Sequence, residues 1–581
     1  MQTINEKTEG GLFRPAYAAL LLIILLTIAL NAGFLRNKTF FRDDFHFIVN
    51  NPSIRSIENI PSYFVSLPMG SSVRENQVVY RPVVTASYAV NYYLGGLGPF
   101  GYHVFNLIVH LLNIVMVCLI VRFMTAEEYL ALGSALLFAV HPLNSELINF
   151  INTRSSSMST LFCLVSFFLY IKATAGDSGK RGLVFLWGSV AAFTAALFTK
   201  ELSIMLPLVI VIYDLLFRRY GLVERMKEAF KRYTPYFVSG IGYMALRSAL
   251  LKSEGLTAKS HHLYDNIYVP VQILTFNLKL LIYPKGLSVF YFDFNPAAYL
   301  GLASALSLVI VVCWLLLPLV IRNRVFTFFV FWMFIMWLPT TAFEMKSTIA
   351  MIVDHRLYIA APGFSFCLAV IIYRLCSLAR RVFKGLEVKK AYAAGVFAVA
   401  AVFTFIHIGR NSVWKDSVSI AGELVEKYPG QSGAHTFLAE EYARKGMVDK
   451  AAAEYMKSYE IDPYNVKVLN NLAGILITRG RLDEAAAMFR QIIEISPSHY
   501  NSYFGLGYVY ERKGLYGEAV RKYERGLKFN PRSTPALLNL ADLYLRQGLL
   551  DAAEMKYNTV LEIDPANHRA VSRLKEISAL R

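Results

Sequence analysis

Charged residues are scarce in this chain. Asp, Glu, Lys and Arg make up 17% of its 581 residues, and 55% of the residues are hydrophobic. Soluble globular domains carry about 25% charged residues, so the composition excludes an ordinary soluble protein. Cysteine is also rare, and the spacing of Cys118, Cys163, Cys313, Cys367 and Cys376 matches no metal-ligand motif. We interpret these cysteines as packing residues in or beside apolar runs.

Acidic residues are outnumbered, at 41 Asp and Glu against 59 Lys and Arg, which gives a net charge of +18. The excess is unevenly placed. From Val418 to the end there are 22 Lys and Arg against 20 Asp and Glu, so +16 of the net charge belongs to the residues before Val418. Because those basic residues follow the loops between apolar runs, they favour a membrane protein over a nucleic-acid-binding one.

Eleven apolar runs are long enough to cross a membrane, which takes about 20 residues per crossing. They begin near residues 15, 104, 129, 157, 183, 202, 234, 299, 325, 358 and 391. No small-x-small cleavage site follows the first run, so we interpret it as a retained helix and not as a signal peptide. A further apolar stretch at 268–286 would break the charge pattern if it crossed. We interpret that stretch as a re-entrant or interfacial helix on the outer side.

The loops between these runs differ in charge. Residues 179–181, 218–233, 321–324 and 374–390 are rich in Lys and Arg. The positive-inside rule predicts that such loops are cytoplasmic. With eleven spans the N-terminus is then cytoplasmic, and the remaining loops and the C-terminus are extracytoplasmic.

The residues from Val418 onward are polar and repeat every 34 residues. Prolines recur at 429, 463, 497, 531 and 565, and glycines at 446, 480, 514 and 548. Alanines recur at 451, 485, 519 and 553, and an aromatic residue stands four residues after each. This pattern is typical of the tetratricopeptide repeat, in which the small alanine allows close helix packing and the aromatic ring fills the gap.

The sequence therefore predicts an all-α protein, with a polytopic membrane helical bundle of about eleven spans followed by a tetratricopeptide-repeat α-solenoid. The bundle is expected over residues 1–410, a linker over 411–417, and four repeats with a capping helix over 418–581. Repeat arrays of this kind bind other proteins, so a protein partner is expected for the second domain.

The first predicted outer loop opens with two adjacent acids, Asp43 and Asp44. Taken alone, such a pair could cap the next helix, where carboxylates accept bonds from free backbone N–H groups. Other ionisable residues fall on the outer loops or at their membrane boundaries, namely Arg81, His103, His141, Glu146, Lys200, Glu201, His355 and Arg356. Singly, His103 and the nearby His110 could bond to neighbouring helices, and Lys200 could pair with Glu201. Together on one side they indicate a functional site, because ionisable groups at that depth are costly.

Several segments follow the order found in one enzyme family. They are FRDDFHFIVNN, HPLNSELINFINTRSS, TKELSIMLPLVIVIYDLL, HRLYIAAPGF and RNSVWKDS, the last followed by the repeats. In these motifs the chain resembles the transmembrane-and-tetratricopeptide-repeat O-mannosyltransferases and their bacterial relatives, which are GT-C glycosyltransferases. The resemblance implies a GT-C type membrane domain, a polyprenyl-phosphate sugar donor, and Asp43 and Asp44 as the acidic motif. His46 and the short array depart from the family pattern, and the short array favours a bacterial inner-membrane protein.

The expected reaction is transfer of a sugar, with mannose one candidate, to an acceptor hydroxyl on a protein or glycan at the outer face, with inversion. Asp43, Asp44 and Glu146 are the expected catalytic acids, because a carboxylate within hydrogen-bond reach can take the hydroxyl proton. The same three oxygen ligands would suit Mg²⁺ or Mn²⁺, and the sequence leaves open whether a metal binds.

Cationic residues are expected to bind the phosphate of the donor, since Arg offers a planar fork and Lys a point charge to phosphate oxygens. The expected phosphate ligands are Arg356, Lys200 and Arg81. The expected substrate contacts are His103, His141, Glu201 and His355.

Two other classes of function stay open from the sequence. A membrane-anchored scaffold that recruits envelope proteins would use the repeats, but it needs only one or two spans. A polysaccharide ligase, a polymerase or a lipid-linked sugar transporter should show large outer loops with Arg/His pairs, or internal repeats within the membrane part, instead of an acidic pair after the first span.

Overall fold

The computed structural model describes residues 15–33, 40–41, 43–67, 79–175, 179–218, 222–253, 268–292, 302–339 and 354–581. The regular structure in these ranges is entirely helical, which confirms the all-α fold class. The chain divides into a membrane unit, Met1–Ile420, and a repeat unit, Ala421–Arg581.

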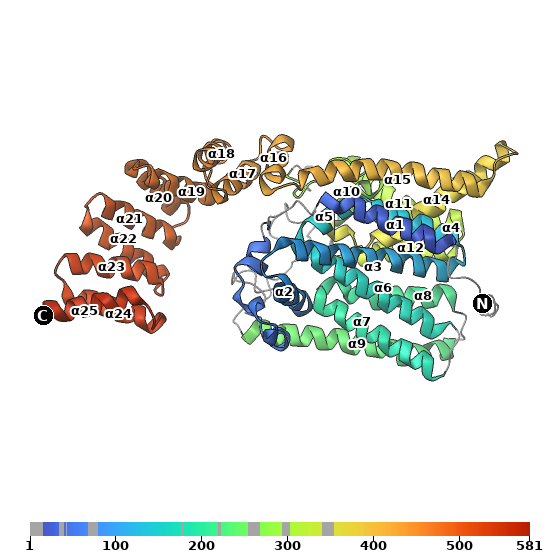
Figure 1. The fold of residues 1–581 in the computed structure, drawn as a ribbon, viewed down its shortest axis with the longest axis horizontal. Coiled ribbons are helices and arrows are strands. Elements are labelled where there is room, and N and C mark those ends of the chain that lie inside the picture. The colour runs from blue at the N-terminus through green and yellow to red at the C-terminus, as the bar shows by residue number, and fades with distance from the viewer. Residues whose placement is uncertain are drawn as a thin grey trace. The chain divides into compact units, whose positions relative to one another are not determined.

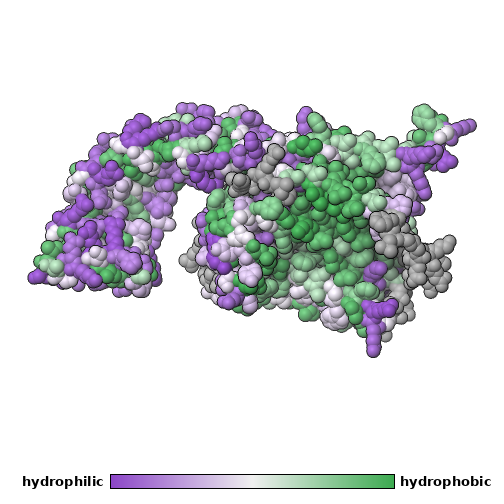
Figure 2. All heavy atoms as spheres, viewed as in Figure 1, coloured by the Kyte–Doolittle hydropathy of each residue, from purple (hydrophilic) through white to green (hydrophobic). Residues whose placement is uncertain are grey.

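Each of the eleven predicted crossing segments is a helix in the membrane unit (Figure 1). Five of them are long and apolar enough to cross a membrane, namely α3 (Pro99–Thr125), α6 (Arg154–Thr174), α7 (Lys180–Thr199), α14 (Ala361–Val382) and α15 (Val388–Val413). The others are α1 (Pro15–Asn31), α4 (Glu128–Val140), α8 (Leu206–Phe217), α9 (Leu222–Ser253), α11 (Leu302–Ile321) and α12 (Arg324–Trp337). One face of this unit is broadly hydrophobic (Figure 2), as expected for a surface in contact with lipid.

The basic loops leave from one end of the bundle. There Arg122 on α3 pairs with Glu128 on α4 at 3.1 Å, and Arg218 after α8 donates to the carbonyl of Thr174 on α6 at 2.9 Å. Arg374 on α14 donates to the carbonyl of Ile321 on α11 at 3.2 Å. We call this end the basic end. The predicted sorting of loops by charge therefore corresponds to a real separation of helix ends.

The opposite end, which we call the loop end, is built from short helices. They are η2 (Phe45–Val49), η3 (Pro52–Arg55), η4 (Ile57–Asn59), η5 (Pro61–Phe64), α2 (Pro82–Gly95), α5 (Asn144–Asn149), η8 (Ile151–Thr153), η9 (Glu201–Met205) and η12 (Asp354–Leu357). Prolines explain part of this interruption: Pro142 follows the end of α4, and Pro207 stands in the first turn of α8.

The 268–286 stretch forms α10 (Tyr268–Ile282), a helix of 15 residues. At 1.5 Å per residue such a helix is about 22 Å long, which is shorter than the roughly 30 Å hydrocarbon core. Its Leu281 carbonyl accepts a bond of 2.9 Å from Nε2 of His141, at the loop end of α4. This end of α10 therefore lies at the loop end, and the helix packs along α11, with Thr275 donating to the Ser307 carbonyl at 3.1 Å. The interpretation of 268–286 as a re-entrant or interfacial helix stays a prediction.

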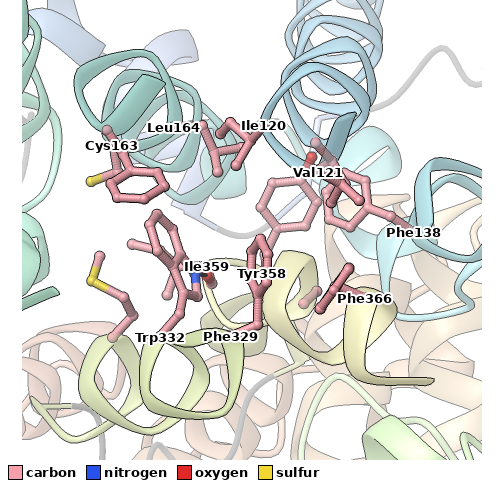
Figure 3. Packing of buried hydrophobic residues seen from close by; sticks show 14 of the residues in the cluster. Ile120, Val121, Phe138, Cys163, Leu164, Phe329, Trp332, Tyr358, Ile359 and Phe366 are labelled. Atoms are coloured by element: carbon pink, nitrogen blue, oxygen red, sulfur yellow. Dashed lines mark hydrogen bonds between the residues drawn. The ribbon is translucent and has the colours of Figure 1, made fainter. Parts of the chain in front are cut away.

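Buried packing fixes the segment that carries His355 and Arg356. Trp332 on α12 donates from Nε1 to the carbonyl of Ile359 at 3.0 Å, and Tyr358 packs against Phe138 on α4 with ring centroids 5.3 Å apart (Figure 3). The Tyr358 hydroxyl also lies 2.7 Å from Nδ1 of His110 on α3. Three helices thus anchor the chain immediately after η12.

The repeat unit is a run of paired helices. They are α17 (Ser432–Arg444), α18 (Val448–Ile461), α19 (Val466–Thr478), α20 (Leu482–Ile495), α21 (Tyr500–Arg512), α22 (Tyr516–Phe529), α23 (Thr534–Arg546) and α24 (Leu550–Ile563), with α25 (His568–Leu580) as the cap. The repeated glycines turn the chain between paired helices with φ of +73° to +76°, a conformation that favours glycine. The repeated alanines are fully buried.

The connection between α15 and the next helix is short. Because α15 ends at Val413 and α16 (Ser417–Lys427) follows, this connection is shorter than the predicted linker 411–417.

Candidate active site

The two adjacent acids have different surroundings. Asp44 is buried, and both of its carboxylate oxygens accept backbone bonds of 2.9 Å, from the N–H of Phe41 and from the N–H of Asn152. Asp43 is half-buried, and its carboxylate lies 3.5 Å from Nδ2 of Asn152. Burial, together with the negative charge of Asp43, raises the pKa of Asp44 to about 8. The two N–H donors and the charge of Arg154 act in the opposite direction and limit this rise. Asp44 is a fixed internal group, and Asp43 is the more accessible acid.

Lys200 is anchored close to the same turn of chain. Its Nζ donates to Oγ of Ser156 at 2.6 Å, and the lysine is 7% exposed. Ser156 follows Asn152 by four residues, about one helical turn. Burial, reinforced by the positive charge of Arg81, lowers the pKa of Lys200 to about 7.

Arg81 and Glu201 form a two-pronged ion pair, with bonds of 2.9 and 3.3 Å from the guanidinium to the two carboxylate oxygens. Although burial opposes it, Arg81 lowers the pKa of Glu201 to about 2. Glu201 therefore pairs with Arg81, and Lys200 bonds to a serine. The boundary pair of Lys200 with Glu201 considered from the sequence is not the arrangement observed.

Glu146 on α5 is buried, and its Oε1 lies 2.9 Å from Nδ1 of His355 on η12. Burial raises the pKa of Glu146 to about 7, while the charges of Arg410 and Lys200 oppose the rise. The pair brings together residues 209 positions apart in the sequence.

His355 lies where the predicted cations meet. Burial, followed by the positive charges of Lys200, Arg356 and Arg81, lowers its pKa well below the usual range, and the charge of Asp43 opposes this. Residues just before η2, α2 and η9, together with Arg356 in η12, thus act on one imidazole at the loop end. The assignment of Asp43, Lys200, Arg81, His355 and Arg356 to one site stays a prediction, with which these charge effects on His355 agree in sign.

Two of the expected substrate contacts have structural partners instead. His103 bonds from Nδ1 to the carbonyl of Ile148 at 2.9 Å, and it is fully buried. His141 uses both ring nitrogens, since Nε2 donates to the Leu281 carbonyl at 2.9 Å and Nδ1 accepts from the Leu143 N–H at 3.3 Å. These bonds give both histidines a role in joining elements, and for His103 that is the alternative that the sequence left open.

The expected metal site is not assembled by the described residues. Among them, no group of three or more His, Cys, Asp or Glu side chains is placed to hold a metal ion. Asp44 is occupied by backbone donors, and Glu146 faces His355. Asp43, Asp44 and Glu146 therefore do not fit a shared Mg²⁺ or Mn²⁺ site.

Sequence reasoning left Arg154 without a role. This arginine at the start of α6 is fully buried, and its guanidinium bonds to Oδ1 of Asn106, Oγ of Ser87 and the Tyr102 carbonyl at 2.8 to 3.1 Å. These bonds tie α2 and α3 to the turn that holds both acids. In the sequence, the only indication of a buried role was that Arg154 lies within a short polar run, NTRSSS.

An apolar groove of about 600 Å³ lies between α7, α8 and α9. Its walls include Phe193, Ile204, Pro207, Tyr236 and Met244. Ile204 belongs to η9, which begins at Glu201, so the groove starts three residues from the Arg81–Glu201 pair. An open apolar groove therefore borders the short helix that follows Lys200.

Comparisons with known proteins agree with both units. Family models of the tetratricopeptide repeat match residues 432–465, 470–534 and 504–568. Protein O-mannosyl-transferase F38B6.6 of Caenorhabditis elegans is 25% identical over 468 residues, 76% of this chain and 63% of the relative. The resemblance to the tetratricopeptide-repeat O-mannosyltransferases is confirmed.

Other O-mannosyl-transferases align over shorter stretches. Human TMTC1 is 31% identical over 188 residues, which are 30% of this chain and 21% of the relative. Human TMTC2 is 30% identical over 156 residues, which are 26% of this chain and 18% of the relative. The matches span less than two thirds of each relative's length. Among solved structures, YrrB, a TPR protein, covers 27% of this chain and 81% of its own at 16% identity and a TM-score of 0.25.

Proposed function

We propose that this protein is a membrane glycosyltransferase that moves a sugar from a polyprenyl-phosphate donor to an acceptor hydroxyl, with protein O-mannosylation the leading case. The observations that support the proposal are three contacts at the loop end: Asn152 with Asp43 at 3.5 Å, Ser156 with Lys200 at 2.6 Å, and Glu146 with His355 at 2.9 Å. The charges of Lys200, Arg356, Arg81 and Asp43 all act on the pKa of His355. The names of the relatives support the same class of reaction.

Asp43 is the base in this proposal, because Asp44 is buried and bonded on both oxygens. Asp43 takes the proton of the acceptor hydroxyl while the hydroxyl oxygen attacks the anomeric carbon of the donor. The bond from that carbon to the phosphate oxygen breaks, and polyprenyl phosphate leaves with the electron pair. Attack opposite the leaving group inverts the anomeric carbon. General base catalysis of this kind contributes typically about 10²- to 10⁴-fold.

Lys200 and Arg356 are the proposed ligands of the leaving phosphate. Charge that develops on the phosphate oxygens is stabilised most strongly by cations fixed in a site with little water. Lys200 meets this condition, because it is 7% exposed and held by Ser156. Arg81 is committed to Glu201, so we assign it the role of fixing η9 beside Lys200.

The groove between α7, α8 and α9 is the proposed site of the polyprenyl chain. Its lining is apolar, and it begins at η9, beside the proposed phosphate ligands. An isoprenoid chain in this groove would hold the anomeric carbon at the loop end. The lipid would thereby contribute binding energy remote from the reacting bond.

The orientation that we propose places the basic end in the cytoplasm and the loop end outside, by the positive-inside rule. In a bacterium this corresponds to an inner-membrane enzyme with a periplasmic site and repeat array. The repeats then offer a docking surface for a protein acceptor or an assembly partner.

The test uses purified protein in proteoliposomes with radiolabelled polyprenyl-phosphate mannose, and with the glucose analogue in parallel. We expect consumption of one donor, a product of inverted configuration, and loss of about 10²-fold or more of the rate in Asp43→Asn. Asp449→Asn is the matched control, because Asp449 is an exposed acid on the repeat unit. Retention of configuration, or full activity in Asp43→Asn, would contradict the mechanism.

A further inference from the structure

The end of α15 reaches the proposed site. Trp414, the first residue after this helix, is 2% exposed and contacts two aromatic residues from distant parts of the chain. Its ring centroid lies 5.9 Å from that of Phe41 and 6.3 Å from that of Phe150, and the latter two are 5.3 Å apart. The three rings form one closed cluster.

The two partners of Trp414 flank the groups that hold Asp44. Phe41 supplies one of the two backbone N–H donors to the Asp44 carboxylate, and it also accepts the Asp44 N–H at its carbonyl at 3.0 Å. Phe150 precedes Asn152, the other donor, by two residues. Trp414 therefore packs against side chains from the two backbone segments that donate to Asp44.

A neighbouring side chain strengthens the same junction. Asn411 on the last turn of α15 donates from Nδ2 to the Leu30 carbonyl at 2.8 Å, and its Oδ1 accepts from Nδ2 of Asn149 at 2.9 Å. These bonds join the ends of α1, α5 and α15. The Arg410 guanidinium lies over the Trp414 ring, 5.7 Å from its centroid.

We propose that Trp414, supported by Asn411, is a positioning residue that sets the two backbone donors of Asp44 and thereby the neighbouring base Asp43. The segment that connects the membrane unit to the repeat array is then a structural wall of the site as well as a tether. The link to catalysis rests on the proposed function, whereas the link to the backbone of Phe41 and Asn152 does not.

The experiment compares Trp414→Ala, Trp414→Phe and Trp337→Ala in the full chain, in lipid nanodiscs. Trp337 on α12 is the matched control, because it is equally buried but packs in a cluster with Leu281 and Phe364. The first readout is hydrogen exchange of peptides that contain the Phe41 and Asn152 amides. The second is kcat and KM for polyprenyl-phosphate mannose.

We expect exchange of both peptides to rise roughly tenfold in Trp414→Ala only, since opening of this junction becomes easier. We expect kcat to fall about 10- to 10²-fold with little change in KM, because a misplaced base slows the reaction more than donor binding. Trp414→Phe should restore most of both properties, since an aromatic ring still fills the cluster.

Equal exchange effects in Trp414→Ala and Trp337→Ala would overturn the proposal, because they would reflect general destabilisation. So would an unchanged kcat in Trp414→Ala when the wild-type enzyme is active. A wild-type protein that consumes no donor, together with faster exchange confined to Trp414→Ala, would refute the transferase function and still support the positioning of the Asp44 donors.

Discussion

Replacement of Lys200 by methionine tests the proposed phosphate site most directly. Methionine keeps the length and the apolar stem of lysine but removes the ammonium group. In the wild-type protein the pKa of Lys200 falls from 10.5 to about 7, mainly through burial, with Arg81 and Arg356 adding to the effect. At about 1.4 kcal/mol per pKa unit, charging this lysine costs about 5 kcal/mol more in the empty site than in water.

The sign of the pH effect follows from this lowered pKa. Below about pH 7 the ammonium is present in the free enzyme, and above it the amine is neutral. A bound donor phosphate offsets the cost of the charge, so the loss should appear in kcat/KM, which reports the free enzyme. We expect Lys200→Met to lower kcat/KM about 10- to 10²-fold at about pH 6, as for one hydrogen bond to a charged group. The deficit should shrink as pH rises, because the wild-type lysine is then neutral as well.

The assay measures kcat/KM for polyprenyl-phosphate mannose from about pH 6 to about pH 9 and takes the ratio of wild type to variant at each pH. The ratio cancels the titration of Asp44, which both proteins share. It does not cancel that of Glu146, because loss of the Lys200 charge raises the pKa of Glu146 further in the variant, so both proteins are compared in a Glu146→Gln background. Lys389→Met, at the opposite end of the bundle, should give a ratio near one throughout. A ratio for Lys200→Met that stays constant with pH, or equals one, would refute the assignment of Lys200 to the phosphate.

Three further predictions follow from the geometry. Asp44→Asn should lower the thermal unfolding temperature more than Asp43→Asn. The reason is that an amide in this place cannot accept from both the Phe41 and the Asn152 N–H, and a buried unsatisfied donor costs about 1–3 kcal/mol. Equal unfolding temperatures would contradict the distinct roles of the two acids. Gly505→Ala should destabilise the repeat unit by about 1–3 kcal/mol in urea unfolding, because a Cβ there would collide with the Phe489 ring. An unchanged urea midpoint would count against this packing. Deletion after Asp416 should weaken acceptor glycosylation more than donor hydrolysis in the same proteoliposomes, and equal losses would argue against acceptor docking by the repeats.

Local patterns in the sequence predicted the helices and the repeats. The eleven apolar runs became helices because a segment in lipid must satisfy its backbone hydrogen bonds internally. The 34-residue period predicted paired helices with buried alanines, and these are present. The length of each crossing was less predictable, because Pro142 and Pro207 shorten the regular helices at the loop end.

For the candidate site the sequence predicted a set of residues and left their pairings open. The sequence placed Asp43, Lys200 and Arg356 on loops of the same side. It left open that Asp44 faces inward while Asp43 is half-buried, and that His141 bonds to the backbone of α10. Adjacent residues such as Asp43 and Asp44 look equivalent in a sequence, because their difference comes from segments far along the chain.

The sequence by itself indicated the eleven long helices, the basic loops between them and the 34-residue repeats. Each of these properties depends on residues close together in the chain. Only the tertiary structure decided that Asn152 donates to Asp44, that Glu146 contacts His355 and that Trp414 packs against Phe41 and Phe150. Contacts of that kind depend on the rotation and depth of each helix against its neighbours, and packing of the whole bundle sets both.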